Sequence, residues 1–147
     1  EIQAKICESI VYKGRRYEGR QAAEILIANQ LAGIKKVSEA GISVKVNTVL
    51  IPEINADHVV TVAKTVAAYG AKIFNIIPLI PQHKLSWCSV PGCDLISKVR
   101  KEAEEYIGVF RHCQRCRADA AGIPGAKDIS EQLYIRPVRA ENTFSHG

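Results

Sequence analysis

Apolar residues recur every three or four positions in three stretches of the chain, the spacing that places them on one face of a helix. The first stretch covers residues 20–40 and is followed by Gly41, a residue type common at helix C-terminal caps. The second covers residues 56–69, with Asn55 as the expected N-cap. The third covers residues 94–110 and carries charged residues opposite its apolar face. The pattern predicts three amphipathic helices.

Two stretches between these helices are rich in β-branched residues, which favour strands. Residues 42–51 alternate apolar and polar positions in their first half, and Pro52 ends the stretch. Residues 72–80 are apolar almost throughout, as in a strand that is covered on both faces. Near the start of the chain, residues 10–17 surround Gly14 and predict a β-hairpin.

The order helix, strand, helix, strand with short connections predicts parallel strands in an α/β layer or barrel. A proline-containing loop, residues 81–92, separates the last strand from the third helix. Periodicity fades from about Pro124, and we expect the tail to be loosely ordered or docked on something absent from this sequence. The chain contains no Met and begins at Glu1 in what resembles the end of a strand. We therefore expect that the sequence is truncated at its start.

The composition, with 147 residues of which 47% are hydrophobic and 24% charged, is that of one soluble globular domain or part of one. No apolar run is as long as a membrane span. The net charge is +5, but Lys and Arg are scattered without interleaved aromatic residues, so we expect neither a nucleic-acid nor a membrane partner. Five cysteines without a secretory signal argue against a disulfide scaffold and predict a reducing, cytoplasmic location.

Cys113 and Cys116 are separated by two residues and flanked by His112 and several arginines. Thiols at this spacing can bind one metal centre together, and cationic neighbours favour the thiolate form that ligates metals, whereas the alternative is a pair of buried thiols that merely pack near a helix end. The pair supplies only two ligands, so the others must come from elsewhere. Zinc, iron–sulfur and thiol–disulfide chemistry all use such pairs. Thiol–disulfide chemistry needs the cysteine pair at a helix N-terminus after a strand, whereas Cys113 and Cys116 follow a predicted helix.

Cys88 and Cys93 are further candidate ligands within the chain. A zinc site would join Cys88, Cys93, Cys113 and Cys116 in one tetrahedral centre, and the chain would then be a zinc-stabilised binding module. The spacing of Cys88 and Cys93 is only loosely like that of a zinc finger, and two ordinary loop cysteines explain it equally well. Cys7 has no partner nearby in the sequence and is expected to be a core or incidental cysteine.

Lys45 and Asn47 alternate with apolar residues and therefore share one face of their predicted strand. On a solvent-facing side they would simply be hydrated, whereas inside a barrel they would contact a ligand. The pattern alone supports both interpretations. Asn75 on the next strand poses the same question. Pro78 and Pro81 interrupt that strand near its carboxyl end, where α/β sheets usually bind ligands.

Five segments of the chain, in this order, resemble those of one known family. They are YEGRQAAE at 17–24, QLAGI at 30–34, VKVNTVLIP at 44–52, NIIPLI at 75–80 and HCQRCRADA at 112–120. Each is modest alone, but their order and the final motif are specific. The chain resembles the NifB family of nitrogenase cofactor maturases, which are radical S-adenosylmethionine enzymes, over about residues 4–125.

The resemblance implies an α/β fold that is the C-terminal part of a partial (β/α) radical S-adenosylmethionine barrel over residues 1–110. An iron–sulfur cluster segment would follow at 111–125 and a loosely ordered tail at 126–147. Family members fuse two 4Fe–4S clusters, with a carbide derived from S-adenosylmethionine and an added sulfur, into the core of the nitrogenase iron–molybdenum cofactor. Their expected partners are cluster donors and the carrier or scaffold proteins of nitrogenase assembly.

The resemblance also assigns roles to residues. Cys113 and Cys116 resemble metal ligands of one of the two substrate clusters, and Lys45 and Asn47 lie on a strand that borders the cosubstrate in such barrels. The C-x3-C-x2-C motif that binds the family's catalytic cluster is absent from this sequence. We therefore expect the chain to be the C-terminal part of the enzyme and to be inactive alone. No catalytic residue is implied, and nothing is transferred beyond Gly125.

Overall fold

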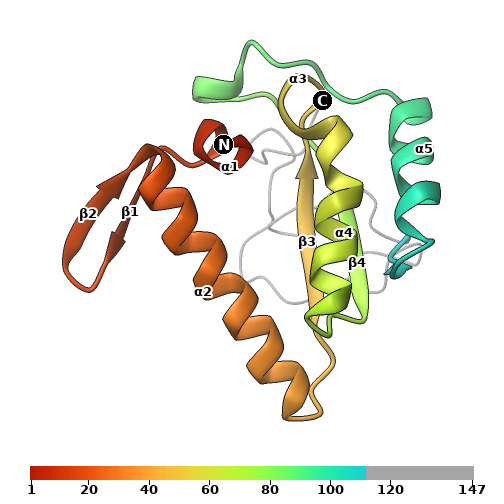
Figure 1. The fold of residues 1–147 in the computed structure, drawn as a ribbon. Coiled ribbons are helices and arrows are strands. Elements are labelled where there is room, and N and C mark those ends of the chain that lie inside the picture. Colours follow the sequence, from red (N-terminus) through yellow and green to blue (C-terminus); the bar gives the residue numbers. More distant parts are fainter. Residues whose placement is uncertain (112–147) are drawn as a thin grey trace, which may run out of the picture. The chain divides into compact units, whose positions relative to one another are not determined.

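A three-stranded parallel sheet forms the centre of the fold (Figure 1). The computed structural model of the protein describes residues 1–111. Strand β3 (Lys45–Leu50) pairs with β4 (Ile73–Pro78), and β4 pairs with the short β5 (Gly108–Val109). Parallel neighbours need a crossover connection, and helices supply it here. The predicted α/β fold with parallel strands is therefore confirmed.

The elements follow one another in an order close to that predicted from the apolar spacing. Their bounds are α1 (Ile2–Ile6), β1 (Ser9–Tyr12), β2 (Arg15–Glu18), α2 (Gly19–Glu39), β3 (Lys45–Leu50), α3 (Pro52–Asn55), the 3-10 turn η1 (Ala56–His58), α4 (Val59–Ala68), β4 (Ile73–Pro78), η2 (His83–Leu85), α5 (Cys93–Ala103) and β5 (Gly108–Val109). Within residues 1–111, a helix of the length and apolarity needed to cross a bilayer is not found.

Helices α4 and α5 pack against one face of the sheet and enclose the main core. Figure 1 shows α4 lying along β3 and β4, with α5 beside it. Leu50, Phe74 and Ile76 of the sheet are fully buried in this core. Burying a side chain of this size contributes roughly 1.5–3 kcal/mol. The two helices contribute Val59, Ala63, Val66, Val99 and Ala103 to the same core.

Helix α2 connects the β1–β2 hairpin to the sheet (Figure 1). The hairpin turns at Lys13 and Gly14, whose φ angles are 49° and 75°. Positive φ at both positions is what a two-residue turn between antiparallel strands requires. Further along α2, Leu31 and Ile34 pack against the main core. The hairpin and the first of the predicted helices are thus confirmed.

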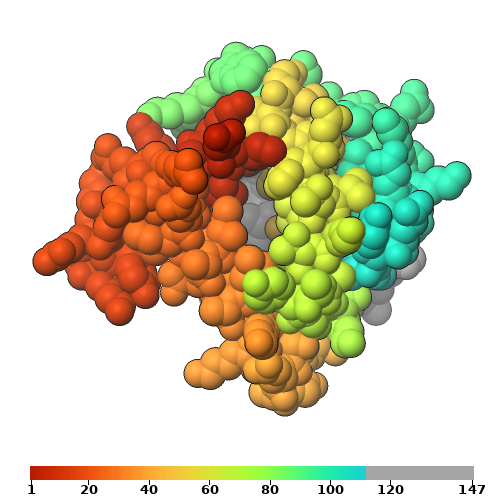
Figure 2. Space-filling view, viewed as in Figure 1, coloured from red at the N-terminus to blue at the C-terminus, as the bar shows by residue number. Residues whose placement is uncertain are grey.

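The start of the chain is a helix, and the predicted strand end at Glu1 is wrong. Ile6, the last residue of α1, packs against a second cluster of buried residues formed by Ile51, Leu79 and Cys88. Ile2 and Ile6 are four positions apart, which is helical spacing, but one turn is too short for that signal to be recognised in sequence. Figure 2 shows α1, in dark red, against the yellow residues of α3.

The third predicted helix, over residues 94–110, is shorter than expected because α5 ends at Ala103. A turn then leads into β5, so the apolar residues near 110 belong to the sheet and not to the helix. Gly108 allows the close approach of two strands, since a Cβ there would lie 3.2 Å from the Lys72 carbonyl oxygen. Val109 is β-branched and half-buried, which suits a strand.

Strand β4 is paired with β5 only at Ile73 and Phe74. Further along the same strand, Arg100 of α5 donates from Nη2 to the Ile76 carbonyl oxygen at 3.3 Å. The Arg100 Nε is buried and has no hydrogen-bond partner within the part of the chain that the structure describes. The guanidinium of Arg100, a residue of helix α5, thus lies at the edge of β4 beyond the end of β5.

The turn after β3 is held by the side chain of Asn55, which is 7% exposed. Its Oδ1 accepts a hydrogen bond from the Ile51 N–H at 2.8 Å, and its Nδ2 donates to the Val49 carbonyl at 2.8 Å. The predicted role of Asn55 as a side-chain N-cap is therefore wrong, because its amide bonds the backbone that precedes it. This turn directs Leu50 into the main core and Ile51 into the second cluster.

Replacing Asn55 by Ala should destabilise the fold by about 2–3 kcal/mol. The change removes two hydrogen bonds and leaves the buried Ile51 N–H and the partly buried Val49 carbonyl without their partner. Urea denaturation measures the free energy of unfolding. Asn29→Ala is the matched control, because the Asn29 side chain bonds the Ile25 carbonyl on an exposed helix surface and its loss should change stability by less than about 0.5 kcal/mol. Equal effects of the two substitutions would contradict the role given to Asn55.

Candidate functional site

The sheet face opposite α4 and α5 carries the polar residues predicted to contact a ligand. Lys45 and Asn47 are exposed on β3, and the parallel register places Ile73 and Asn75 beside them on β4. Side chains alternate between the two faces of a strand, so these four share one face while the main core occupies the other. The structure therefore brings Lys45, Asn47 and Asn75 together. Their role in ligand binding stays a prediction.

Asn47 and Asn75 form an amide pair across the two strands. The Asn75 Nδ2 donates to the Asn47 Oδ1 at 3.1 Å. Asn75 is only 2% exposed, whereas Asn47 is exposed. The Asn75 Oδ1 is buried and has no hydrogen-bond partner among the described residues. Buried side-chain amides normally satisfy both of their polar atoms, so this carbonyl is an unused acceptor in the middle of the sheet face.

Toward the carboxyl ends of β3 and β4, the same face becomes apolar. Ile51 and Leu79 follow the two strands at positions that share the face with Asn47 and Asn75. Both belong to the second cluster, which Ile6 of α1 helps to cover. The amide pair thus lies between an apolar end and the cationic side chain of Lys45.

The loop over residues 79–92 is fixed at two points by carboxylates from other segments. Glu53 of α3 accepts a hydrogen bond from the Ser89 N–H at 2.8 Å, and this bond lowers the pKa of the Glu53 carboxyl. Lys84 forms an ion pair with Glu8 at 2.5 Å, and its hydrogen bond and charge lower the pKa of the Glu8 carboxyl. Both partners of the ion pair are exposed, so the pair holds the loop in place but adds little to the stability of the fold.

Cys88 is a buried thiol that packs among apolar residues. The residue is 5% exposed and packs in the second cluster with Ile51 and Leu79. Burial, followed by the neighbouring Glu53 carboxylate, raises the pKa of the Cys88 thiol above its ordinary value. Both influences favour the protonated form of the Cys88 thiol.

The remaining cysteines do not gather into a site within residues 1–111. Cys93 is exposed at the start of α5, and the Cys7 thiol contacts the Ser9 carbonyl oxygen at 3.6 Å. Among the residues described, three or more His, Cys, Asp or Glu side chains do not come together as a metal ion would require. Cys113 and Cys116, the predicted metal ligands, lie outside the described residues.

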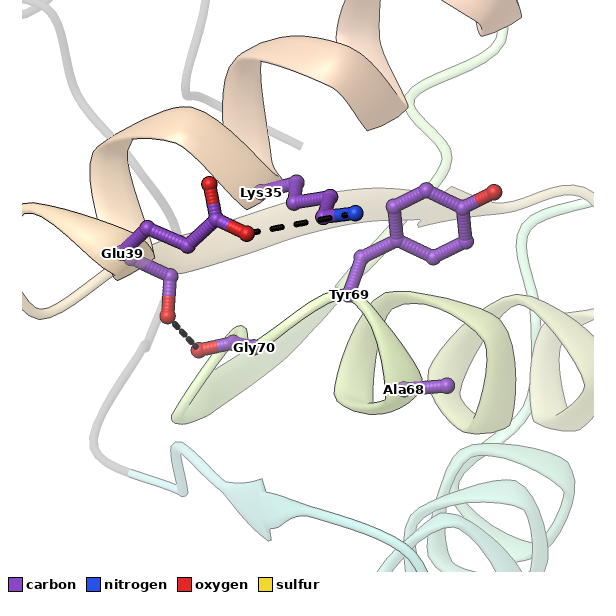
Figure 3. Close-up of a pocket in the computed structure, with 6 residues that line it drawn as sticks. Lys35, Glu39, Ala68, Tyr69 and Gly70 are labelled. Atoms are coloured by element: carbon purple, nitrogen blue, oxygen red, sulfur yellow. Dashed lines mark hydrogen bonds and ion pairs between the residues drawn. The ribbon is translucent and has the colours of Figure 1, made fainter.

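A shallow pocket lies between the ends of α2 and α4 (Figure 3). Its polar groups are already paired. Lys35 and Glu39 form an exposed ion pair at 3.9 Å, and the Ser38 hydroxyl donates to the Gly70 carbonyl at 2.9 Å. The helix ends that line it lead into the amino ends of β3 and β4, whereas parallel sheets bind ligands at their carboxyl ends. We therefore assign it no ligand.

Sequence reasoning identified the polar face but missed the residue that holds the loop beside it. Lys45, Asn47 and Asn75 were recognisable because they interrupt apolar strands at alternating positions. Glu53 was not recognisable, because its partner Ser89 lies 36 positions further along the chain. A bond between a carboxylate and a backbone N–H requires no particular residue type at the donor position, so it leaves no sequence pattern.

Comparison with known proteins places the chain among a set of related sequences, although the scan of protein-family models gives no match. The chain is 46% identical over 142 residues to the FeMo cofactor biosynthesis protein NifB of Methanocaldococcus infernus, which covers 97% of the chain and 47% of that relative. The NifB protein of Methanocaldococcus jannaschii is 44% identical over 144 residues, covering 98% of the chain and 48% of the relative. That of Bradyrhizobium diazoefficiens is 43% identical over 137 residues, covering 89% and 28%.

These matches confirm the resemblance inferred from the five sequence segments. They extend over nearly the whole chain at identities far above the level of chance similarity. The chain spans about half the length of the two Methanocaldococcus relatives and a smaller share of the third.

Cys88 and Cys93 should differ strongly in reactivity. At pH 8, iodoacetamide should alkylate the exposed Cys93 readily and Cys88 at a rate lower by about tenfold or more. Cys88 is buried, and its raised pKa leaves a smaller fraction ionised than in an ordinary thiol at the same pH. Peptide mapping by mass spectrometry after timed alkylation of the folded protein measures both rates. The unfolded protein, in which both cysteines should react alike, is the control. Equal rates in the folded protein would show that Cys88 is not held as described.

Proposed function

We propose that the chain takes part in the biosynthesis of the iron–molybdenum cofactor of nitrogenase, because it is similar to the NifB proteins over nearly its whole length. The observation that carries this proposal is the 46% identity over 97% of the chain to a protein named for FeMo cofactor biosynthesis. The chain spans about half of that relative, so the reaction of the whole protein is part of the proposal.

The proposed reaction is the fusion of two 4Fe–4S cluster substrates, with a carbide and a sulfur, into the cofactor core by a radical S-adenosylmethionine enzyme. S-adenosylmethionine, when bound, would supply the radical chemistry and the carbon atom. The proposed partners are an iron–sulfur cluster donor and a carrier or scaffold protein that receives the product. The proposed fold of the whole is a partial (β/α) barrel, and the parallel sheet with helices on one face supports it.

The sheet face opposite those helices supports a ligand site within that barrel. Lys45 and Asn47 lie on it, and the buried Asn75 carbonyl beside them lacks a donor among the described residues. An ammonium group and a side-chain amide on one exposed stretch of strand suit a polar cosubstrate such as S-adenosylmethionine. We assign Lys45 and Asn47 to holding and orienting the cosubstrate on this face.

Cys113 and Cys116 are the proposed ligands of one of the cluster substrates. Two thiolates separated by two residues bind adjacent positions of an iron–sulfur cluster. The remaining ligands of that cluster would come from other residues of the complete protein. The C-x3-C-x2-C motif is absent from these 147 residues, and we propose that the chain by itself does not cleave S-adenosylmethionine.

The alternative function is a zinc-stabilised binding module that uses Cys88, Cys93, Cys113 and Cys116. The structure weighs against it at one of these four positions. The Cys88 side chain is buried in the second cluster, and among the residues described it does not gather with two further His, Cys, Asp or Glu side chains.

Replacing Cys113 and Cys116 together by Ala should remove one cluster from the complete protein. Iron and acid-labile sulfide should each fall by about four per polypeptide, because neither thiolate remains to hold that cluster. Elemental and sulfide analysis of anaerobically purified protein measures the loss. Cys93→Ala, which removes an exposed cysteine outside the pair, should leave both contents unchanged.

Unchanged iron in the double variant would refute the ligand assignment. One zinc per polypeptide without sulfide would support the zinc-binding module instead.

A further inference from the structure

The β1–β2 hairpin has a free edge along β2. The hairpin contacts α2, and Figure 1 shows β2 on its outer side, away from the main sheet. On the other edge, the Ser9 carbonyl of β1 already accepts a hydrogen bond from the Cys7 thiol at 3.6 Å. A hairpin of two strands is marginally stable by itself, and a third strand along an open edge extends its ladder of hydrogen bonds. The β2 edge is therefore a position at which a further strand can add.

The register of the hairpin determines which backbone groups face this edge. The Gly19 N–H donates to the Glu8 carbonyl at 3.2 Å, so these two residues form a hydrogen-bonded pair at the base of the hairpin. Such pairs alternate along an antiparallel ladder with pairs whose backbone groups point outward. Three steps further on, Arg16 lies opposite Val11 in an outward-pointing pair. The Arg16 N–H and carbonyl therefore face the free side of β2, and neither has a backbone partner among the described residues.

Cations surround these two backbone groups. Lys13, Arg15 and Arg16 are exposed, and Glu18 is the only acidic residue of the hairpin, which thus carries a net positive charge. The Arg16 Nε donates to the Glu18 Oε1 at 2.8 Å, so this side chain lies along its own strand and leaves the edge open. Neither Arg15 nor Lys13 has an ion-pair partner in the part of the chain that the structure describes.

The charges select the kind of strand that can add. The β2 edge of a second copy would bring arginines toward arginines, which disfavours pairing between identical hairpins, whereas carboxylates opposite Arg15 and Arg16 are favourable. Val11 is 74% exposed next to Arg16 and offers an apolar contact that suits a protein partner. Three cations interrupted by Glu18 form a small footprint for a nucleic acid, which binds through an extended basic surface.

We propose that the β2 edge binds an extended acidic segment of a partner protein, which adds antiparallel to β2 as a third strand. The Arg16 N–H and carbonyl exchange hydrogen bonds with one residue of that segment, and the guanidinium groups of Arg15 and Arg16 pair with its carboxylates. The hairpin is separate from the polar face of β3 and β4, so this docking site goes beyond the proposed function and does not depend on it.

A rhodamine-labelled peptide of sequence Thr-Val-Glu-Glu-Val-Thr tests the proposal, because antiparallel addition can place its two Glu residues opposite Arg16 and Arg15. Fluorescence anisotropy with the unsubstituted protein measures the Kd, and Thr-Val-Lys-Lys-Val-Thr is the matched control peptide. The acidic peptide should bind about tenfold or more tightly than the basic one. It should also slow amide hydrogen exchange within residues 9–18, measured by mass spectrometry, because an added strand protects the edge.

Methylating the backbone nitrogen of the peptide Glu that faces Arg16 tests strand addition without altering the protein. The Kd should rise about tenfold, because the donor to the Arg16 carbonyl is lost while both carboxylates remain. A methylated peptide that binds as tightly as its parent would overturn the proposed strand addition.

Reversing the charge at Arg15→Glu and Arg16→Glu together should reverse the preference, so that the basic peptide binds more tightly. Lys98→Glu with Lys101→Glu makes the same change of charge at exposed positions of α5 and should leave the preference as it is. No measurable binding, or equal binding of the two peptides to the unsubstituted protein, would overturn the proposal. Tighter binding of a short DNA duplex than of the acidic peptide, lost on reversing the two arginines, would replace it with a nucleic-acid surface.

Discussion

The two hydrogen bonds of the Asn55 side chain determine where the first strand of the sheet ends, and much of the remaining structure follows from that point. By bonding Val49 and Ile51, the amide turns the chain sharply into α3. The turn assigns consecutive residues to two separate hydrophobic groups. It also places Glu53 where its carboxylate receives the Ser89 N–H. The strand end, the second cluster and the loop over residues 79–92 therefore share one local cause.

The two faces of the sheet differ in composition. One is largely apolar, with Thr48 as a polar position on β3, and is covered by α4 and α5, so it supplies much of the stability of the fold. The other changes from cationic to amide-bearing to apolar over a few residues, as a face that recognises a ligand with distinct parts would. The division follows from strand alternation, because one set of positions can stay apolar while the next varies.

Much of this arrangement was predictable from local spacing. Apolar residues recur at the helical period over residues 20–40 and 56–69, and the two main strands are rich in apolar residues. Turn residues mark the hairpin. Helix α1 and strand β5 escaped prediction because they are too short to show a period. The polar face was visible as interruptions of apolar strands. The amide pairing, the burial of Cys88 and the bond from Ser89 were not visible in the sequence, because each depends on a residue distant in sequence.

The Arg100 guanidinium at the edge of β4 has a consequence for association between molecules. A strand whose carbonyls and N–H groups face outward is a template on which a strand of another molecule can add, and proteins guard such edges with charge. Beyond the two residues paired with β5, the Ile76 carbonyl is already bonded to Arg100, whose bulk and charge stand in the path of an incoming backbone. The partly buried guanidinium thus occupies a position on the β4 edge at which the backbone of an added strand would otherwise bond.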